Sequence, residues 1–205
     1  MSQPPPATGL GRARVLGVVG GVGSGKSAVA RLVAGAWGAD LIDGDAAGHE
    51  TLARPEVAAE VAAEFGDVLD ASGAVDRRKL GPIAFADAAA MARLEAILHP
   101  RMRRRFEADI AAAGAAGRPV VFDAAVLLEA GWRDLCDSVA FVDAPDDVRR
   151  SRAVGRGWSE ERWRSAEASQ WPVARKRAAA DVTLDNAADD GGRAAAEALA
   201  AWLAA

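Results

Sequence analysis

Eight consecutive residues near the N-terminus, Gly20-Gly-Val-Gly-Ser-Gly-Lys-Ser27, fit the pattern G-x-x-x-x-G-K-[ST]. Glycines let a backbone curl so that successive amide N–H groups point at phosphate oxygens, and a helix starting there adds the partial positive charge of its N-terminus. In such loops the lysine reaches the β- and γ-phosphates of a nucleotide and the serine ligates Mg²⁺. The pattern therefore predicts a site for ATP and Mg²⁺, formed by Gly21, Val22, Gly23, Ser24, Gly25, Lys26, Ser27 and Ala28.

Phosphoryl transfer to a hydroxyl group needs further side chains, and the sequence offers a candidate for each. Asp43 and Asp45 follow a short apolar run, where one carboxylate would orient or deprotonate the acceptor. Asp123 ends another apolar run, where it would contact Mg²⁺ through water. Arginines would neutralise the transferring phosphoryl group, and the candidates are Arg149, Arg152 and Arg156.

Each of these residues also has a purely structural interpretation. An aspartate after a strand often caps the next helix, which is a role open to Asp43 and Asp45 and expected for Asp146. Arginines three or four residues apart, such as Arg149 and Arg152, often form a solvated helix face.

The elements that would position these residues alternate along the chain. Short apolar runs predict five strands, at residues 14–19, 40–43, 119–123, 138–142 and 182–184. Helical patterns predict helices at 25–37, 46–115, 148–177 and 194–204. Strands that alternate with helices predict a doubly wound α/β fold with a parallel sheet of about five strands.

Local signals subdivide the helical stretches. Pro55 is expected to open one helix, Asp76 to cap another, and Pro100 to start a third after Leu98-His99. Gly155 and Gly157 are expected to hinge a mobile lid.

Bulk composition bounds the class of protein. The chain has 205 residues, is 51% hydrophobic and carries a net charge of −4, which fits a globular protein without a general attraction to nucleic acid or membranes. Its single cysteine, Cys136, excludes an internal disulfide. The N-terminal residues lack the apolar region of a signal peptide, and a cytoplasmic location is expected. No membrane contact and no obligate protein partner are predicted.

A phosphate loop alone does not distinguish a kinase from a nucleotide-dependent switch. Guanine-specific switches usually carry N-K-x-D, and the only asparagine of this chain, Asn186, is followed by Ala187. Two classes of function remain at this point. One is a kinase of a small molecule, such as a nucleoside or nucleoside monophosphate, and the other is a non-enzymatic switch that uses ATP binding to reorganise a surface for a protein partner.

Several blocks in order resemble the dephospho-coenzyme A kinase family. Ile42-Asp-Gly-Asp45 followed by Gly48-His49 resembles I-D-A-D-x-x-G-H of that family. Further matching blocks are Val75–Phe85, Leu94–Pro100, Asp123–Glu129, and the spacing of Gln170, Lys176-Arg177, Ala180-Asp181 and Asn186.

The resemblance implies a reaction and roles for residues. ATP would phosphorylate the ribose 3′-hydroxyl of dephospho-coenzyme A, the last step of coenzyme A synthesis. Asp45 would be the catalytic base, with Lys26 and Arg156 as further catalytic residues, and Arg152 would bind ATP. The substrate side would comprise Asp43, His49, Arg77, His99 and Arg103. Two alternatives stay open, because His99 beside Pro100 could instead shape a turn and the arginines of residues 101–105 could form a solvated face.

The resemblance also implies a division of the chain. The composition of residues 1–13, rich in proline and glycine, predicts a disordered tail, and the resemblance implies a single kinase domain at 14–205. Its core would be residues 14–45, 118–147 and 181–205, with a helical substrate-binding insert at about 46–117 and a small helical lid at about 148–180. Three residues depart from the family pattern: Ala125 replaces proline, Gly44 replaces alanine, and Gly157 replaces an acid. These changes bear on the rigidity of the turn after Asp123 and on the role of Arg156.

Overall fold

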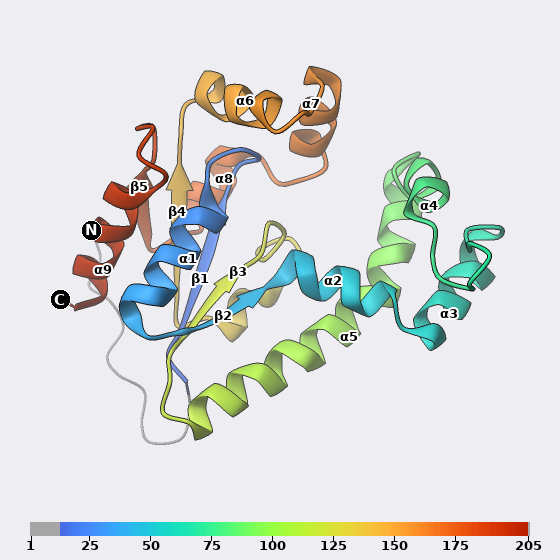
Figure 1. Ribbon diagram of the computed structural model, residues 1–205, viewed down its shortest axis with the longest axis horizontal. Helices are drawn as coiled ribbons and strands as arrows, with labels where there is room; N and C mark the ends of the chain where they lie inside the picture. Colours follow the sequence, from blue (N-terminus) through green and yellow to red (C-terminus); the bar gives the residue numbers. More distant parts are fainter. Residues whose placement is uncertain (1–12, 205) are drawn as a thin grey trace. The chain divides into compact units, whose positions relative to one another are not determined.

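The computed structural model describes residues 13–204, so residues 1–12 of the predicted tail lie outside the described residues. Its centre is a sheet of five parallel strands in the order β2-β3-β1-β4-β5, with helices on both faces (Figure 1). The strands are β1 (Val15–Gly20), β2 (Asp40–Asp43), β3 (Val120–Asp123), β4 (Ser138–Asp143) and β5 (Val182–Asp185). The predicted parallel α/β fold is confirmed, and each strand ends within one residue of its predicted position.

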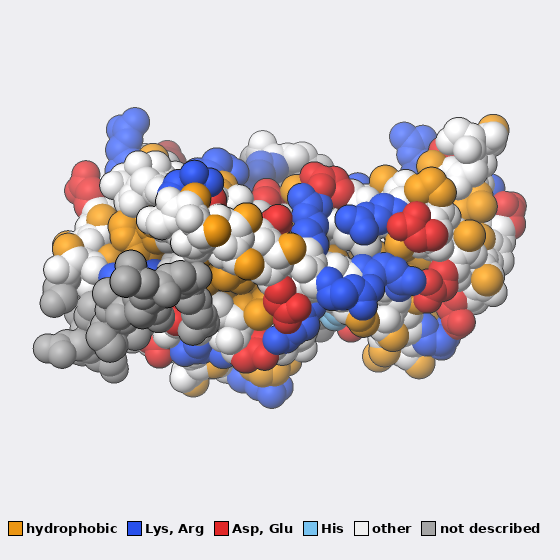
Figure 2. Space-filling view, turned by 90° about the horizontal axis from the view of Figure 1, so that it is seen from below, with side chains coloured by type: hydrophobic (Ala, Val, Ile, Leu, Met, Phe, Trp, Pro, Cys, Tyr) orange, Lys and Arg blue, Asp and Glu red, His pale blue; other side chains and the backbone are white. Residues whose placement is uncertain are grey.

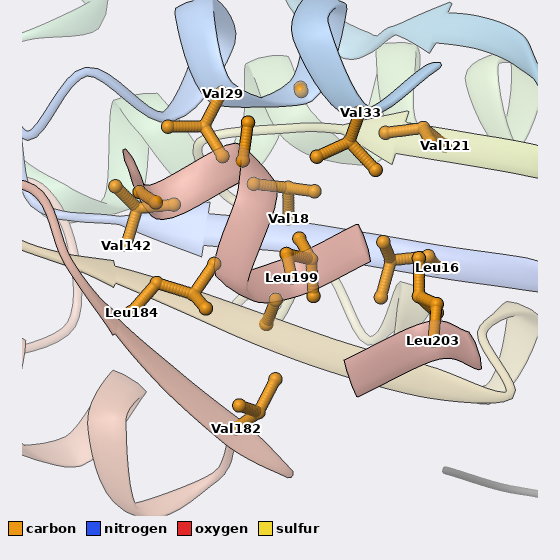
Figure 3. Close-up of a cluster of buried hydrophobic side chains, with 14 of the residues drawn as sticks. Leu16, Val18, Val29, Val33, Val121, Val142, Val182, Leu184, Leu199 and Leu203 are labelled. Carbon is orange, nitrogen blue, oxygen red and sulfur yellow. The ribbon is translucent and has the colours of Figure 1, made fainter. Parts of the chain in front are cut away.

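The main core lies between the sheet and two helices, α1 (Lys26–Trp37) and α9 (Arg193–Ala204). Alternate residues of β1, Leu16 and Val18, point to this side of the sheet, as strand geometry requires (Figure 3). Val29 and Val33 of α1 and Leu199 of α9 meet them at helical spacing. This packing fixes the first turn of α1, and with it Lys26 and Ser27, against the end of β1.

The opposite face of β1 contains Gly17, which leaves room for Cys136 and Leu127. A Cβ on Gly17 would lie 3.0 Å from the Cys136 sulfur and 3.1 Å from Leu127 Cδ1, so close packing disfavours a side chain there. Burial raises the pKa of the Cys136 thiol to about 12, which keeps it protonated and unreactive. Cys136 is therefore a core residue in this structure.

The chain divides into two compact units, one made of residues up to Asp43 and from Ala108 onward, the other of Gly44–Glu107. The second unit is helical and contains α2 (Gly44–Leu52), α3 (Pro55–Phe65), α4 (Arg77–Ala84) and the larger part of α5 (Ala88–Ala115). Pro55 opens α3 and the Asp76 side chain caps α4 by accepting from the Arg78 N–H, both as predicted. The unit has a core of its own, formed by Leu52, Val57, Val61, Phe65, Val68, Leu80, Ala84, Ala90 and Ile97.

The prediction that Pro100 starts a helix is wrong, because Pro100 lies inside α5, a continuous helix of 28 residues. Proline lacks the N–H that would bond the carbonyl four residues earlier. The carbonyl that loses its backbone donor in this way is that of Ala96, and the Arg101 side chain donates to the next carbonyl, that of Ile97, at 2.5 Å. Across residues 13–204, no helix combines the length and apolarity needed to cross a membrane.

Three helices, instead of one hinged piece, occupy the stretch after β4: α6 (Asp146–Gly155), α7 (Glu160–Ala168) and α8 (Val173–Ala178). The first break falls at the predicted glycines, and Gly157 has a φ of +84° that favours glycine. Asp146 does not cap α6 as expected. It is the first residue of the helix, and its carboxylate accepts instead from Arg149 Nη2 at 2.7 Å.

Candidate active site

The loop between β1 and α1 has the curled backbone that its glycines predict. Gly23 and Gly25 have φ values of +86° and +89°, in a region of backbone conformation that residues other than glycine rarely adopt. Gly25 precedes α1 directly, and its carbonyl accepts from the Ala28 N–H at 2.9 Å. The loop therefore delivers its amides and the N-terminus of α1 to one place, as phosphate binding requires.

Gly23 also lies against the backbone of α6. A Cβ at this position would collide with the backbone oxygen of Arg149. We expect Gly23→Ala to weaken ATP binding at least about tenfold, because both the positive φ and the close approach oppose a side chain. Isothermal titration with ATP measures this effect.

Gly35→Ala is the matched control for this substitution. Gly35 lies inside α1, and a Cβ there meets nothing within 4 Å. The control should bind ATP as the wild type does. Unchanged ATP affinity in Gly23→Ala would show that the loop tolerates a side chain at this position and that its geometry is not what binds phosphate.

A buried ion pair lies beside the loop at the carboxyl edge of the sheet. Lys26 Nζ is 2.7 Å from Asp123 Oδ1, and the two side chains are 13% and 5% exposed. Ser27 Oγ lies 3.4 Å from the same Lys26 nitrogen. Asp43 is the register partner of Asp123 on the neighbouring strand β2, so both carboxylates end adjacent strands. The structure thus brings three predicted residues of the ATP and Mg²⁺ site, together with Asp43 of the predicted substrate side, to one edge.

Arg152 and Asn186 hold the loop from the side of α6 and β5. Arg152 Nη1 donates to the carbonyls of Ser24 and Asn186 at 3.3 and 2.8 Å. The Asn186 amide also donates to the Ser24 carbonyl, at 2.7 Å, and is buried. Arg152, predicted to bind ATP, therefore contacts the loop itself. Arg156 lies at the C-terminal end of α6 and is exposed.

A second lysine near the loop was not assigned a role from the sequence. Lys176 of α8 is fully buried, and burial lowers its pKa while Glu129 acts in the opposite direction. Its ammonium lies 2.9 Å from Glu129 and donates to Gln170 and to the Ala125 carbonyl, both at 2.7 Å. It thereby holds the turn that follows Asp123, where alanine replaces the family's proline. The only sequence signal for this network is that its members lie in two blocks that resemble the family, Asp123–Glu129 and the spacing of Gln170 and Lys176.

The remaining predicted residues belong to the helical unit. Asp45 and His49 are one turn apart on α2, both exposed, and Asp45 follows the end of β2 by two residues. Arg77 is the first residue of α4 and is exposed. His99 and Arg103 are one turn apart on α5.

Acidic partners compensate several basic side chains of α5. Arg103 pairs with Glu107 at 2.9 Å, Arg101 with Glu60 at 2.5 Å, and Arg105 with Glu50. On the face seen in Figure 2, Lys and Arg side chains likewise have Asp and Glu side chains beside them. Exposed pairs of this kind are weak, so a bound anion can displace the acid.

His99 is half-buried, which affects its predicted role. Burial lowers its pKa below the ordinary value, with Glu95 acting in the opposite direction. A histidine with a pKa below about 6.5 is neutral at pH 7. A role for His99 toward an anionic substrate would therefore rely on hydrogen bonding at neutral pH, whereas Arg77 and Arg103 carry permanent charge.

Comparisons with known proteins agree on one family. The family model described as Dephospho-CoA kinase matches residues 14–190. A Dephospho-CoA kinase of Thermobifida fusca is 42% identical over 174 residues, which is 83% of this chain and 86% of that relative. One of Anaeromyxobacter dehalogenans is also 42% identical, over 85% of this chain and 84% of the relative.

Solved structures extend the agreement to the fold. The crystal structure of a Thermus thermophilus protein is 31% identical, with a TM-score of 0.78 over 94% of this chain and 98% of that one. A Dephospho-CoA kinase from Campylobacter jejuni has a TM-score of 0.62 at 21% identity, over 93% of this chain and 97% of that one. The second likeness supports the fold alone.

Proposed function

The chain belongs to the dephospho-CoA kinase family, and from that membership we propose that it transfers the γ-phosphoryl group of ATP to the ribose 3′-hydroxyl of dephospho-CoA. The product is coenzyme A, so the reaction is the final step of coenzyme A synthesis. The observation that carries the proposal is the family match over residues 14–190, which includes the phosphate loop and Asp45.

ATP would bind with its phosphates in the loop between β1 and α1. The loop amides and Lys26 would neutralise the β- and γ-phosphates. In the structure Lys26 pairs with Asp123, and the pair can open toward a phosphate because the ammonium exchanges one anion for another. Arg152 would hold the loop and the nucleotide together, because it already bonds the Ser24 carbonyl.

The residues present fit a magnesium ion. Ser27 supplies a hydroxyl on the first turn of α1, and Asp123 supplies a buried carboxylate, so both ligand types are the hard oxygens that Mg²⁺ takes together with phosphates and waters. Ser27 would bind the ion directly and Asp123 through water. When bound, Mg²⁺ would neutralise charge on the β- and γ-phosphates.

Asp45 would orient the 3′-hydroxyl and accept its proton as the new O–P bond forms. Its side chain is exposed on the first turn of α2, where a substrate can reach it. Arg156 would stabilise the equatorial oxygens of the transferring group. Asp43, His49, Arg77, His99 and Arg103 would hold the acceptor, whose pyrophosphate calls for cations nearby.

A panel of acceptors tests the proposal. Purified protein with ATP and Mg²⁺ should release ADP rapidly with dephospho-CoA and slowly with nucleosides, nucleoside monophosphates or no acceptor. Faster turnover with a nucleoside would replace the proposed substrate while keeping a kinase. Slow, acceptor-independent hydrolysis throughout would favour a nucleotide-dependent switch.

A further inference from the structure

One residue of the phosphate loop is bonded by three side chains of the helices that follow β4. The Val22 N–H donates to Glu167 Oε1 at 2.6 Å. The Val22 carbonyl accepts from the Trp163 indole at 3.2 Å and from Arg149 Nη1 at 3.3 Å. Both the N–H and the carbonyl of Val22 are therefore hydrogen-bonded to side chains of α6 and α7.

The carboxylate of Glu167 is held by two groups that suit an anion, a backbone amide and a guanidinium. Besides the Val22 amide, the same Oε1 atom lies 2.6 Å from Arg149 Nη1. The Arg149 side chain is only 3% exposed, its guanidinium lies 5.6 Å from the centre of the Trp163 ring, and its other terminal nitrogen bonds Asp146. A loop amide and a buried guanidinium therefore converge on one oxygen atom of Glu167. Donors of these two kinds also bind phosphate oxygens in proteins.

We propose that Glu167 occupies, in the nucleotide-free enzyme, a position that a phosphate of ATP takes over, and that Arg149 then passes from the carboxylate to the phosphate. The inference rests on the proposed function insofar as ATP is the ligand of the loop. It assigns a role to Glu167, which no sequence pattern marks, as the residue that sets ATP affinity. For Arg149, one of the three candidate arginines, it specifies that phosphate is bound only after Glu167 is released.

The reason for displacement is electrostatic and geometric. A single N–H cannot bond fully to two acceptors, and a second anion beside the phosphates is repelled at short range. Glu167 belongs to α7, which is joined to α6 through Gly157, a residue with positive φ. Release of the carboxylate would free α7 to move, so phosphate binding and helix movement would be linked.

Glu167→Gln tests the competition, since it removes the charge and keeps the shape. We expect the dissociation constant of ATP to fall about tenfold. This is the change expected if Glu167 occupies the phosphate position in about nine-tenths of the wild-type molecules, so that only about one-tenth can bind ATP directly. The melting temperature without nucleotide should fall, because a charge-assisted bond to the loop is lost, and the rise on adding ATP should be larger than in the wild type. Titration calorimetry and thermal unfolding measure the two effects.

Glu161→Gln is the matched control, because Glu161 is exposed on the same helix and the net charge changes equally. It should bind ATP within about twofold of the wild type, since exposed charges matter little. If Glu167→Gln binds ATP no more tightly than the wild type, Glu167 is only a structural partner of Arg149 and the inference is overturned.

Arg149→Gln in the Glu167→Gln background tests the second assignment. The double variant removes the buried charge of Arg149 together with its partner charge and should lose the gain in ATP affinity. A gain that survives would show that Arg149 does not contact phosphate. All these titrations omit the acceptor, so a failed acceptor assay with intact ATP binding would count against the proposed substrate alone, whereas an absence of ATP binding in the wild type would overturn both.

Discussion

Lys26→Ala is expected to lower kcat at least about a thousandfold, because it removes the ammonium that faces the β- and γ-phosphates. Binding of ATP should weaken as well, since the lysine acts on the ground state in addition to the transition state. Single-turnover kinetics with ATP and dephospho-CoA, together with titration of ATP, separate the two contributions.

The same substitution leaves Asp123 buried without its partner, and that consequence can be measured separately. Breaking a buried ion pair typically destabilises a protein by about 3–5 kcal/mol, and both side chains here are largely buried. Lys26→Ala combined with Asp123→Ala should recover much of the stability but none of the activity. Lys79→Ala, at an exposed lysine paired with Asp67, is the control and should behave as the wild type. Near-normal turnover by folded Lys26→Ala would contradict the assignment of the phosphate loop.

Asp45→Asn should lower kcat by about two to three orders of magnitude while ATP affinity stays within about twofold. The amide keeps the shape of the side chain but cannot accept the hydroxyl proton, and general-base catalysis typically contributes a factor of about 10²–10⁴. Steady-state rates at saturating dephospho-CoA and ATP give kcat, and calorimetry gives the affinity for ATP.

Asp67→Asn is a suitable control for Asp45→Asn. Asp67 belongs to the same helical unit, and its side chain is 90% exposed. The control should retain full activity, because an exposed carboxylate of this kind contributes little. Normal kcat in Asp45→Asn would exclude Asp45 as the base and leave Asp43, the exposed aspartate at the end of β2, as the next candidate.

The fold could be predicted because the inner strands β1, β3 and β4 are buried on both faces. They are continuous apolar runs, as at residues 139–142, and the loops between strands and helices are marked by glycine or aspartate. The helix through Pro100 was missed because proline usually starts or ends a helix. Buried residues on both sides of it, Ile97 and Phe106, show that α5 is packed along this stretch. No local pattern of the sequence encodes that packing.

Only part of the candidate site could be predicted, because only part of it is contiguous in the sequence. Residues 20–27 are contiguous, and one motif defines them. The pairing of Lys26 with Asp123 joins residues 97 positions apart, and that of Val22 with Glu167 joins residues 145 apart. Glu167 lies in a helix rich in charged residues, where a single acid has no distinguishing signal. Lys176 was on a recognised family spacing, yet its burial became apparent only from the packing of α8.

The measurement that tests the account most directly is the position of the transferred phosphate. The protein would be incubated with ATP, Mg²⁺ and dephospho-CoA, and the product identified by mass spectrometry and ³¹P NMR. We expect a product one phosphate heavier than dephospho-CoA, with a new phosphomonoester on the ribose 3′ oxygen, formed in equal amount to ADP. ADP formation without any phosphorylated dephospho-CoA, or a phosphate on a different oxygen, would contradict the proposed function.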